Sequence, residues 1–222
     1  MDKILDSGIL PPVFTVSGPS GVGKDTLTDY IISLFPDLFY RGVSMTSRKP
    51  RLGEVNGVHY WFVSEKEFRQ RIEKKHFIEW KEVHGNLYGT LWKEFRRAQT
   101  EGKIFLFDLD VNGSNALKCH PVISKCLFRL FITISDHRDL YERILKRSGA
   151  KPVIGDDILS RVATAKREME RAPEFDAVIV NDDLARAKAD LLEILSYFLL
   201  SCRVEKFVPP EIEEVIWGAI PG

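Results

Sequence analysis

Short apolar runs rich in β-branched and aromatic residues alternate along the chain with segments of helical spacing. The first run covers residues 13–16, and after a glycine-rich turn apolar residues recur at helical intervals from Leu27 to Leu34, until Pro36 ends the pattern. Further runs of the same kind lie at 104–107, 127–134 and 177–180. This alternation predicts an α/β fold with a parallel sheet covered on both faces, which would bind ligands at the carboxyl ends of its strands.

Two segments interrupt the alternation. Residues 43–88 are dense in aromatic residues, arginine and glycine, with short strand-like pieces such as 60–63, and they predict a small inserted α+β lobe. The segment from Tyr141 to Pro173 is highly charged and helical with a break at 148–155, and it predicts a mobile lid. The expected parts are a core at 1–42, 91–140 and 174–202, the lobe at 43–90, the lid at 141–173 and a C-terminal extension at 203–222.

The extension is too apolar for a free tail, because Phe207, Ile212, Ile216 and Trp217 recur along it. We expect it to pack on the domain or on a second subunit. The sequence leaves both arrangements open, and with them the choice between a monomer and a homodimer.

Composition narrows the function classes. The 222 residues suit one large domain with inserted parts, and the formal net charge of zero provides no overall field for nucleic acid or an acidic membrane surface. The three cysteines lack metal-ligand spacing, and the longest apolar run, at 191–202, is interrupted by Glu193 and too short to span a bilayer. No signal peptide is evident at the N-terminus. We therefore expect a cytoplasmic protein without nucleic-acid or membrane partners, in which any anion site is built locally.

The glycine-rich turn after the first apolar run matches the pattern of a phosphate-binding loop. Its glycines let backbone N–H groups point at a polyphosphate, and Lys24 can reach the outer phosphates. A predicted strand before the loop and a predicted helix after it provide the context that the pattern requires. The residues expected to bind the polyphosphate are Gly18, Pro19, Ser20, Gly21, Val22, Gly23, Lys24, Asp25 and Thr26.

Asp25 departs from this pattern, since a serine or threonine hydroxyl that ligates magnesium is usual there. Thr26 cannot simply replace that hydroxyl, because it lies about 100° further round the helix. In one interpretation the carboxylate binds Mg²⁺ directly. In a second, phosphates and water hold the Mg²⁺, and Asp25 is a first-turn acid favoured by the helix dipole. In a third, repulsion between Asp25 and phosphate weakens the activity.

Several separate motifs follow in order along the chain. They are R-x-x-R-x-G-E-x-x-G-x-x-Y from Arg48 to Tyr60, F-I-E-W at 77–80, Y-G-T at 88–90, D-x-D at 108–110 and V-I-V-N-D-D at 178–183. With these motifs the chain resembles the guanylate kinases from about residue 12 to residue 195. The resemblance implies a P-loop parallel sheet flanked by helices, an inserted α+β lobe that binds a nucleoside monophosphate, and a helical lid. It also implies transfer of the γ-phosphoryl group from ATP to GMP or dGMP, with Mg²⁺ as cofactor.

The side chains of the lobe suit such an acceptor. Arg48 and Arg51 offer planar forks to a phosphate, and the phenols of Tyr60 and Tyr88 can donate hydrogen bonds to the same anion. Glu79, among apolar neighbours, is a carboxylate in need of donors, and guanine offers two adjacent N–H groups that adenine cannot present. Each residue could instead have an ordinary structural role, as a solvated arginine, a core tyrosine or an acid paired with a neighbouring lysine.

The resemblance adds further residues to the expected site. It places Ser44 and Thr90 at the base and Asp110 on the acceptor side, although Asp110 could also simply cap the helix that follows. It places Asn181 near the adenine of ATP. Asp108, at a strand end, could hold a magnesium-bound water or orient Lys24, and we include it among the GMP-binding residues. Asp182 and Asp183 are expected to cap the last helix.

Cationic side chains carry the expected catalysis, because phosphoryl transfer needs positioning and charge neutralisation more than covalent chemistry. Lys24 would act on the donor phosphates and Arg48 on the acceptor. By resemblance, Arg143, Arg147 and Arg161 of the lid would act on the moving group, although the first two share a helix face and could be solvated. The lid loop after Arg147 lacks the Arg-Gly pair usual in the family.

The sequence thus predicts a guanylate kinase, an ATP:GMP phosphotransferase whose lobe and lid close over both nucleotides. Two other functions are weighed against it. A guanylate-kinase-like module that binds proteins would have no use for Lys24 in an intact loop. A related sugar-phosphate kinase would have no use for Glu79 beside the acceptor tyrosines. The preference between GMP and dGMP stays open.

Overall fold

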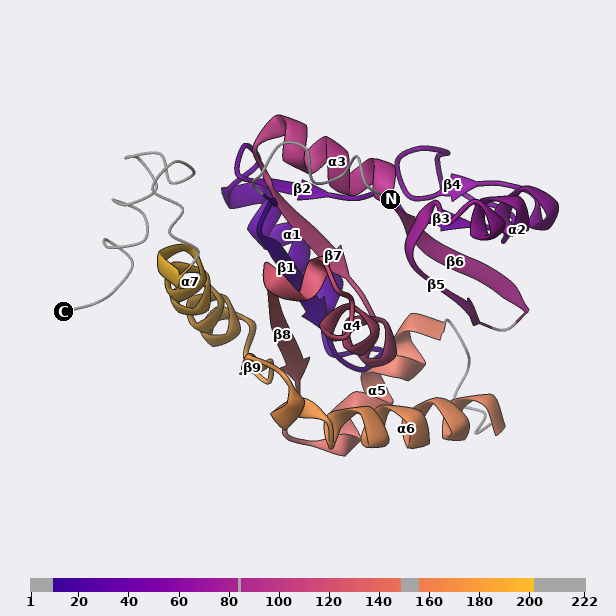
Figure 1. Ribbon diagram of the computed structural model, residues 1–222. Coiled ribbons are helices and arrows are strands. Elements are labelled where there is room, and N and C mark those ends of the chain that lie inside the picture. Colours follow the sequence, from indigo (N-terminus) through magenta and orange to yellow (C-terminus); the bar gives the residue numbers. More distant parts are fainter. Residues whose placement is uncertain (1–9, 84, 149–155, 202–222) are drawn as a thin grey trace.

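A parallel five-stranded sheet forms the centre of the molecule in this computed structural model, which describes residues 10–83, 85–148 and 156–201 (Figure 1). Its strand order is β2-β7-β1-β8-β9, so the strand that leads into the phosphate loop lies in the middle. The strands are β1 (Val13–Ser17), β2 (Phe39–Arg41), β7 (Ile104–Asp108), β8 (Leu127–Thr133) and β9 (Ala177–Val180).

Helices cover both faces of this sheet because successive side chains of a strand point to opposite faces. Phe14 and Val16 of β1 pack in one core with helices α1 and α7, whereas Val13 packs in another with α3 and α4. The helices of the core and lid are α1 (Lys24–Leu34), α3 (Trp92–Glu101), α4 (Val111–Lys118), α5 (His137–Ser148), α6 (Asp156–Met169) and α7 (Leu184–Ser201). None of the helices within the described ranges is long and apolar enough to cross a membrane.

A second, four-stranded sheet lies beside the first and belongs to the segment that interrupts the alternation (Figure 1). Its order is β4-β3-β6-β5, and it has its own core, in which the rings of Phe68 and Phe77 stack at 4.4 Å. Its elements are β3 (Met45–Thr46), β4 (Trp61–Phe62), α2 (Glu65–Glu73), β5 (Phe77–Val83) and β6 (Asn86–Leu91).

The predicted fold class is confirmed, since the runs at 13–16, 104–107, 127–134 and 177–180 form strands of the parallel sheet. One edge strand, β2, was not predicted, because it has only three residues and Phe39 alone of them is buried. The exact bounds of lobe and lid remain predictions. The lid loop at 149–155 and the extension at 203–222 lie outside the described residues.

Candidate active site

The phosphate loop joins the carboxyl end of β1 to the start of α1, and its glycines are required by its shape. Gly18, Gly21 and Gly23 all have positive φ angles, of 142°, 92° and 92°. A Cβ atom on Gly18 would lie 2.1 Å from the backbone oxygen of Ile132, so no larger residue fits there. The loop therefore packs directly against the end of β8.

Lys24, the first residue of α1, folds back over this loop. Its Nζ donates hydrogen bonds to the backbone oxygens of Gly18, at 2.7 Å, and Pro19, at 3.0 Å. A cavity of about 230 Å³ opens beside it, lined by Gly21, Gly23, Lys24, Asp25, Thr26 and Arg143. The lid arginine Arg143 thus reaches the same space as the lysine, as an anion site requires.

Asn181 forms a hydrogen bond with the backbone of the phosphate loop. Its buried Nδ2 donates to the backbone oxygen of Val22 at 2.7 Å, and a Cβ on Gly23 would lie only 2.4 Å from that nitrogen. Its backbone oxygen accepts from both terminal nitrogens of Arg143 at 3.1 Å. Asn181 therefore connects the loop to lid helix α5, and its predicted place near the adenine stays a prediction.

The two acids that follow Asn181 differ in role. Asp183 accepts a hydrogen bond from the backbone N–H of Arg186 at 2.8 Å and so caps α7, as predicted. Asp182 instead accepts from the backbone N–H of Ser135 at 2.9 Å and from its hydroxyl at 2.5 Å. The prediction that Asp182 caps the helix is therefore wrong, because its carboxylate ties the loop after β8 to the loop after β9.

Asp25 contacts a second carboxyl group, that of Asp108 at the end of β7. The two share a hydrogen bond, and Arg41 lies 3.7 Å from Asp108. Burial raises the pKa of Asp108 to about 6, the charge of Asp25 adds to the rise, and the charges of Lys24 and Arg41 oppose it. A cation bound beside the two acids would lower the pKa of Asp108 again.

Replacement of Asp108 by asparagine is expected to change the pH dependence of stability in metal-free protein. The folded-state pKa lies above the unfolded value, so the stabilising contribution of Asp108 is present below pH 4 and is lost as the pH rises through about 6. Between pH 5 and 8 the wild type should lose about 1 kcal/mol more unfolding free energy than Asp108→Asn. Urea unfolding in the presence of a chelator measures this, with Asp37→Asn as an exposed control. Equal losses in all three proteins would contradict the assignment.

The base-binding residues predicted from the sequence come together on β5 and β6. Glu79 and Thr90 are cross-strand partners, and the Thr90 hydroxyl donates to the Glu79 carboxylate. The Ser44 hydroxyl lies 3.3 Å from that of Thr90 and completes the chain of hydrogen bonds. Burial raises the pKa of Glu79, and the hydrogen bond from Thr90 opposes the rise.

A small cavity of about 100 Å³ lies between this group and the central sheet. It is lined by Arg41, Gly42, Ser44, His59, Tyr60, Thr90, Leu106, Phe107 and Asp108. Asp108 thus faces this cavity and touches Asp25 of the phosphate loop, so the two candidate sites adjoin.

The predicted phosphate clamp is assembled around Arg48. Its guanidinium lies 5.6 Å from the ring centre of Tyr60 and donates to the phenol oxygen of Tyr88, and the two tyrosine rings are 6.0 Å apart. Glu54 holds Arg48 by two hydrogen bonds of 2.8 and 2.9 Å, and this pairing lowers the pKa of Glu54 to about 2. Arg51 is exposed, and only its backbone N–H reaches Glu54, at 2.7 Å.

Asp110 acts as the N-cap of α4 and accepts a hydrogen bond from the N–H of Gly113 at 2.7 Å. Its other carboxylate oxygen forms an ion pair with Lys81. Lys81 therefore pairs with Asp110, and Glu79 keeps Thr90 as its hydrogen-bond partner. The proposed role of Asp110 on the acceptor side remains a prediction.

Comparison with known proteins shows which family the chain belongs to. The guanylate kinase family profile matches residues 12–197. The chain belongs to the guanylate kinase family. A guanylate kinase from Helicobacter pylori (strain J99) is 43% identical over 179 residues, which cover 81% of this chain and 84% of the relative. One from Campylobacter jejuni (strain RM1221) is 38% identical over 183 residues, covering 82% and 87%.

A solved structure shows the same fold. The crystal structure of guanylate kinase from Anaplasma phagocytophilum aligns with a TM-score of 0.63 at 22% identity, and the alignment covers 96% of this chain and 97% of that one. The predicted family and the predicted fold class are therefore both confirmed.

Two glutamates with no role predicted from the sequence organise this guanylate kinase site. One is Glu54, which holds Arg48. The other is buried Glu94, which accepts hydrogen bonds from the Tyr40 hydroxyl at 2.6 Å, the Val43 N–H at 3.1 Å and the Trp61 indole at 3.4 Å. Glu94 thereby joins the core strand β2 to the lobe. The burial of Glu94 could not be predicted from the sequence, because its neighbours in this amphipathic helix are aromatic and charged residues alike.

The structure describes the side chain of one of the three lid arginines. Arg143 reaches the phosphate loop. Arg147 lies on α5 and Arg161 on α6, but their side chains lie outside the described part of the structure. Their catalytic roles remain predictions.

Proposed function

We propose that the protein transfers the γ-phosphoryl group of ATP to GMP or dGMP, giving ADP and GDP or dGDP. The contact between Asp25 and Asp108 carries this proposal, because it makes the phosphate-loop cavity and the guanine-type acceptor cavity adjoin. Family membership supports the reaction.

The side chains in and around each cavity suit one nucleotide. The loop N–H groups and Lys24 would hold the ATP phosphates, while Arg48, Arg51, Tyr60 and Tyr88 would hold the acceptor phosphate. The carboxylate of Glu79 would accept the two adjacent N–H groups of guanine. Glu54 would be a positioning residue, because it fixes the guanidinium of Arg48 by two hydrogen bonds.

The reaction itself needs no covalent intermediate with the protein. A phosphate oxygen of GMP forms a bond to the γ-phosphorus while the bond from that phosphorus to the β–γ bridging oxygen breaks, and the electron pair leaves with ADP. Lys24, Arg48 and Arg143 would neutralise charge along this path. Closure of lobe and lid would exclude water that competes with GMP.

The residues present fit a magnesium ion. Asp25 and Asp108 place two carboxyl groups in contact at the loop, and hard divalent cations prefer such oxygens. Within the described residues no group of three or more acids, histidines or cysteines could hold a metal. A magnesium ion bound here would therefore take its other ligands from phosphates and water. Bound Mg²⁺ would neutralise phosphate charge, and we assign its protein contact to Asp25.

Replacement of Asp25 by asparagine should therefore raise the Mg²⁺ concentration for half-maximal turnover by about tenfold or more, because it removes the charged ligand. A Mg²⁺ titration of ATP turnover with GMP measures this, with Asp37→Asn as the control. An unchanged titration would favour the second interpretation, in which phosphates and water alone hold the ion. Faster turnover in the variant would favour repulsion between Asp25 and phosphate.

A competition assay tests the function as a whole. ATP turnover is measured with GMP, dGMP, AMP, UMP and a sugar phosphate as acceptors. We expect turnover with GMP, and by far the highest kcat/KM for a guanine nucleotide. Absence of turnover with GMP would indicate a binding module, and faster turnover with the sugar phosphate would indicate the related kinase.

A further inference from the structure

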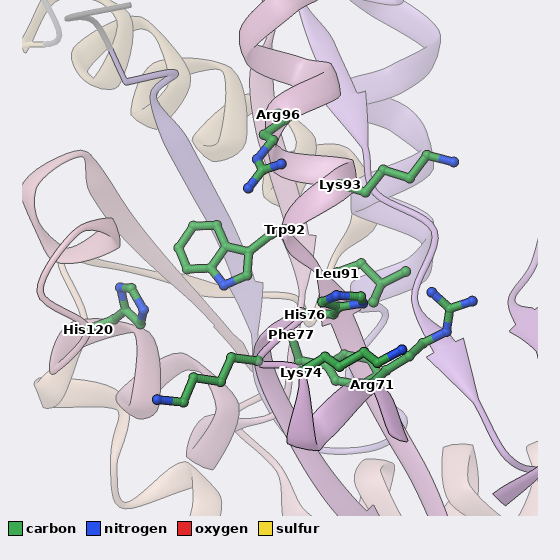
Figure 2. Close-up of a pocket in the computed structure, with 10 residues that line it drawn as sticks. Arg71, Lys74, His76, Phe77, Leu91, Trp92, Lys93, Arg96 and His120 are labelled. Atoms are coloured by element: carbon green, nitrogen blue, oxygen red, sulfur yellow. The ribbon is translucent and has the colours of Figure 1, made fainter. Parts of the chain in front are cut away.

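A third pocket, strongly basic and of about 650 Å³, lies where the lobe meets the core, apart from both nucleotide cavities (Figure 2). The end of α2, the starts of β5 and α3 and the loop after α4 form it. None of its residues lines the loop cavity or the acceptor cavity. Its lining consists of Arg71, Lys74, Lys75, His76, Phe77, Leu91, Trp92, Lys93, Arg96 and His120.

Five of these side chains are cationic and none is acidic, although the whole chain has no net charge. Lys74, Lys75 and Arg96 are exposed and form no ion pair with any residue in the described ranges. Arg71 pairs with Glu67 at 2.8 Å, but its buried Nε has no hydrogen-bond partner there. Of the five cations, Arg71 alone has an ion-pair partner among the described residues. Such a cluster of like charges with little counter-charge is unfavourable in isolation and suits an anionic ligand.

The backbone at Lys75, in the lining of this pocket, is strained. Lys75 has a φ of 54°, the one positive φ of a non-glycine residue among those described. Its N–H donates to Ile72 and that of His76 to Arg71, the pattern that ends a helix with a left-handed residue. Glycine adopts this backbone conformation more readily, so the lysine has a local cost.

An aromatic platform lies among the cations. Trp92 is half-buried, with its ring perpendicular to that of Phe95 at 5.7 Å and 5.3 Å from that of His120. Figure 2 shows Arg96 and His120 around this ring. The backbone N–H of Trp92 donates to the oxygen of His76 at 2.9 Å, which fixes two sides of the pocket to each other.

His120 adds a neutral donor. Its Nδ1 accepts from the backbone N–H groups of Val122 and Ile123, both at 3.2 Å, so the neutral ring carries its proton on Nε2. Burial lowers the pKa of His120 and favours this neutral form.

We propose that this pocket binds a nucleoside polyphosphate, with its base on Trp92 and its phosphates on Lys74, Lys75 and Arg96. The volume suits a small molecule. A single-stranded nucleic acid would need successive aromatic platforms along a groove. In this lining Phe77 is buried, which leaves Trp92 as the accessible platform. A membrane surface would need charges on a convex face with apolar residues exposed among them, whereas here the charges surround a concavity.

Calorimetric titration tests the proposal. The β,γ-imido analogue of ATP, which cannot transfer its γ-phosphoryl group to GMP, is titrated into protein saturated with GMP and ADP–Mg²⁺. The same titration is made with Lys74→Gln/Lys75→Gln/Arg96→Gln, in which the proposed active site is intact. The heats of displacement from the active site are common to both proteins, so their difference isolates the pocket. We expect one additional equivalent to bind to the wild type, and a loss of at least about tenfold in that affinity in the triple variant.

The matched control is Arg69→Gln/Lys125→Gln/Arg186→Gln, which removes the same charge from exposed positions elsewhere and should bind as the wild type does. Tripolyphosphate should bind at least about tenfold more weakly than the analogue, because it lacks the base that stacks on Trp92. Equal binding of tripolyphosphate would overturn the role of the base. The site would be overturned if the wild type bound no equivalent beyond that bound by the triple variant. It would also be overturned if a 12-nucleotide RNA or phosphatidylglycerol vesicles, and not the nucleotide, bound to the wild type more tightly than to the triple variant. Turnover with GMP, measured separately, should be the same in all three proteins.

Discussion

Replacement of Lys24 by alanine is expected to lower kcat by about 10³-fold or more, because it removes the cation that neutralises the donor phosphates in the transition state. In the structure this cation rests on the backbone oxygens of Gly18 and Pro19, ready to exchange them for phosphate oxygens. Lys24 does not line the acceptor cavity, so the affinity for GMP should change little.

Steady-state kinetics with ATP and GMP, together with equilibrium binding of GMP, separate the two effects. The loop should keep its shape in Lys24→Ala, because the contacts of Gly18 with Ile132 and of Asn181 with Val22 do not involve the lysine. Thermal unfolding checks this, and Lys125→Ala is the exposed control. Turnover above about a tenth of the wild-type value would contradict the assigned role.

The phosphate loop could be predicted from sequence because its determinants are local. A buried strand, three glycines with positive φ and a lysine at the helix start lie within a dozen residues. The base site was predictable for another reason, since Glu79 among apolar neighbours requires a polar partner. The resemblance placed Thr90 at the base site, and the structure adds the cross-strand register that makes Thr90 the hydrogen-bond partner of Glu79.

The contact between Asp25 and Asp108 could not be predicted, because it depends on the order of strands in the sheet. β7 lies next to β1 with Val16 opposite Asp108, which brings the acid beside the loop that follows β1. Alternating runs predict that both strands exist but not that they are neighbours. The roles of Glu54 and Glu94 were missed for a similar reason. Glu54 binds Arg48, six residues earlier, because the chain turns back between them. Glu94 accepts hydrogen bonds from three residues that lie in other segments of the chain.

Replacement of Glu79 by glutamine is expected to lower kcat/KM for GMP by about 10³-fold or more, since a buried group that mismatches its partners is costly on both sides. The amide can accept from only one of the two guanine N–H groups and turns its own N–H₂ toward the other. The structure supports a specific loss, because the Thr90 hydroxyl that donates to Glu79 can still donate to the amide oxygen.

Inosine monophosphate makes this test selective, because it keeps the ring N–H of guanine and lacks the exocyclic amine. The wild type should prefer GMP to inosine monophosphate, and Glu79→Gln should lose most of that preference, since the carboxylate oxygen that accepts from the amine is gone. Glu82→Gln is the matched control, an exposed acid on the same strand with the same change of charge. If Glu79→Gln lowered kcat/KM for both acceptors by one common factor, the residue would have a structural role and the guanine selectivity would come from Ser44 and Thr90.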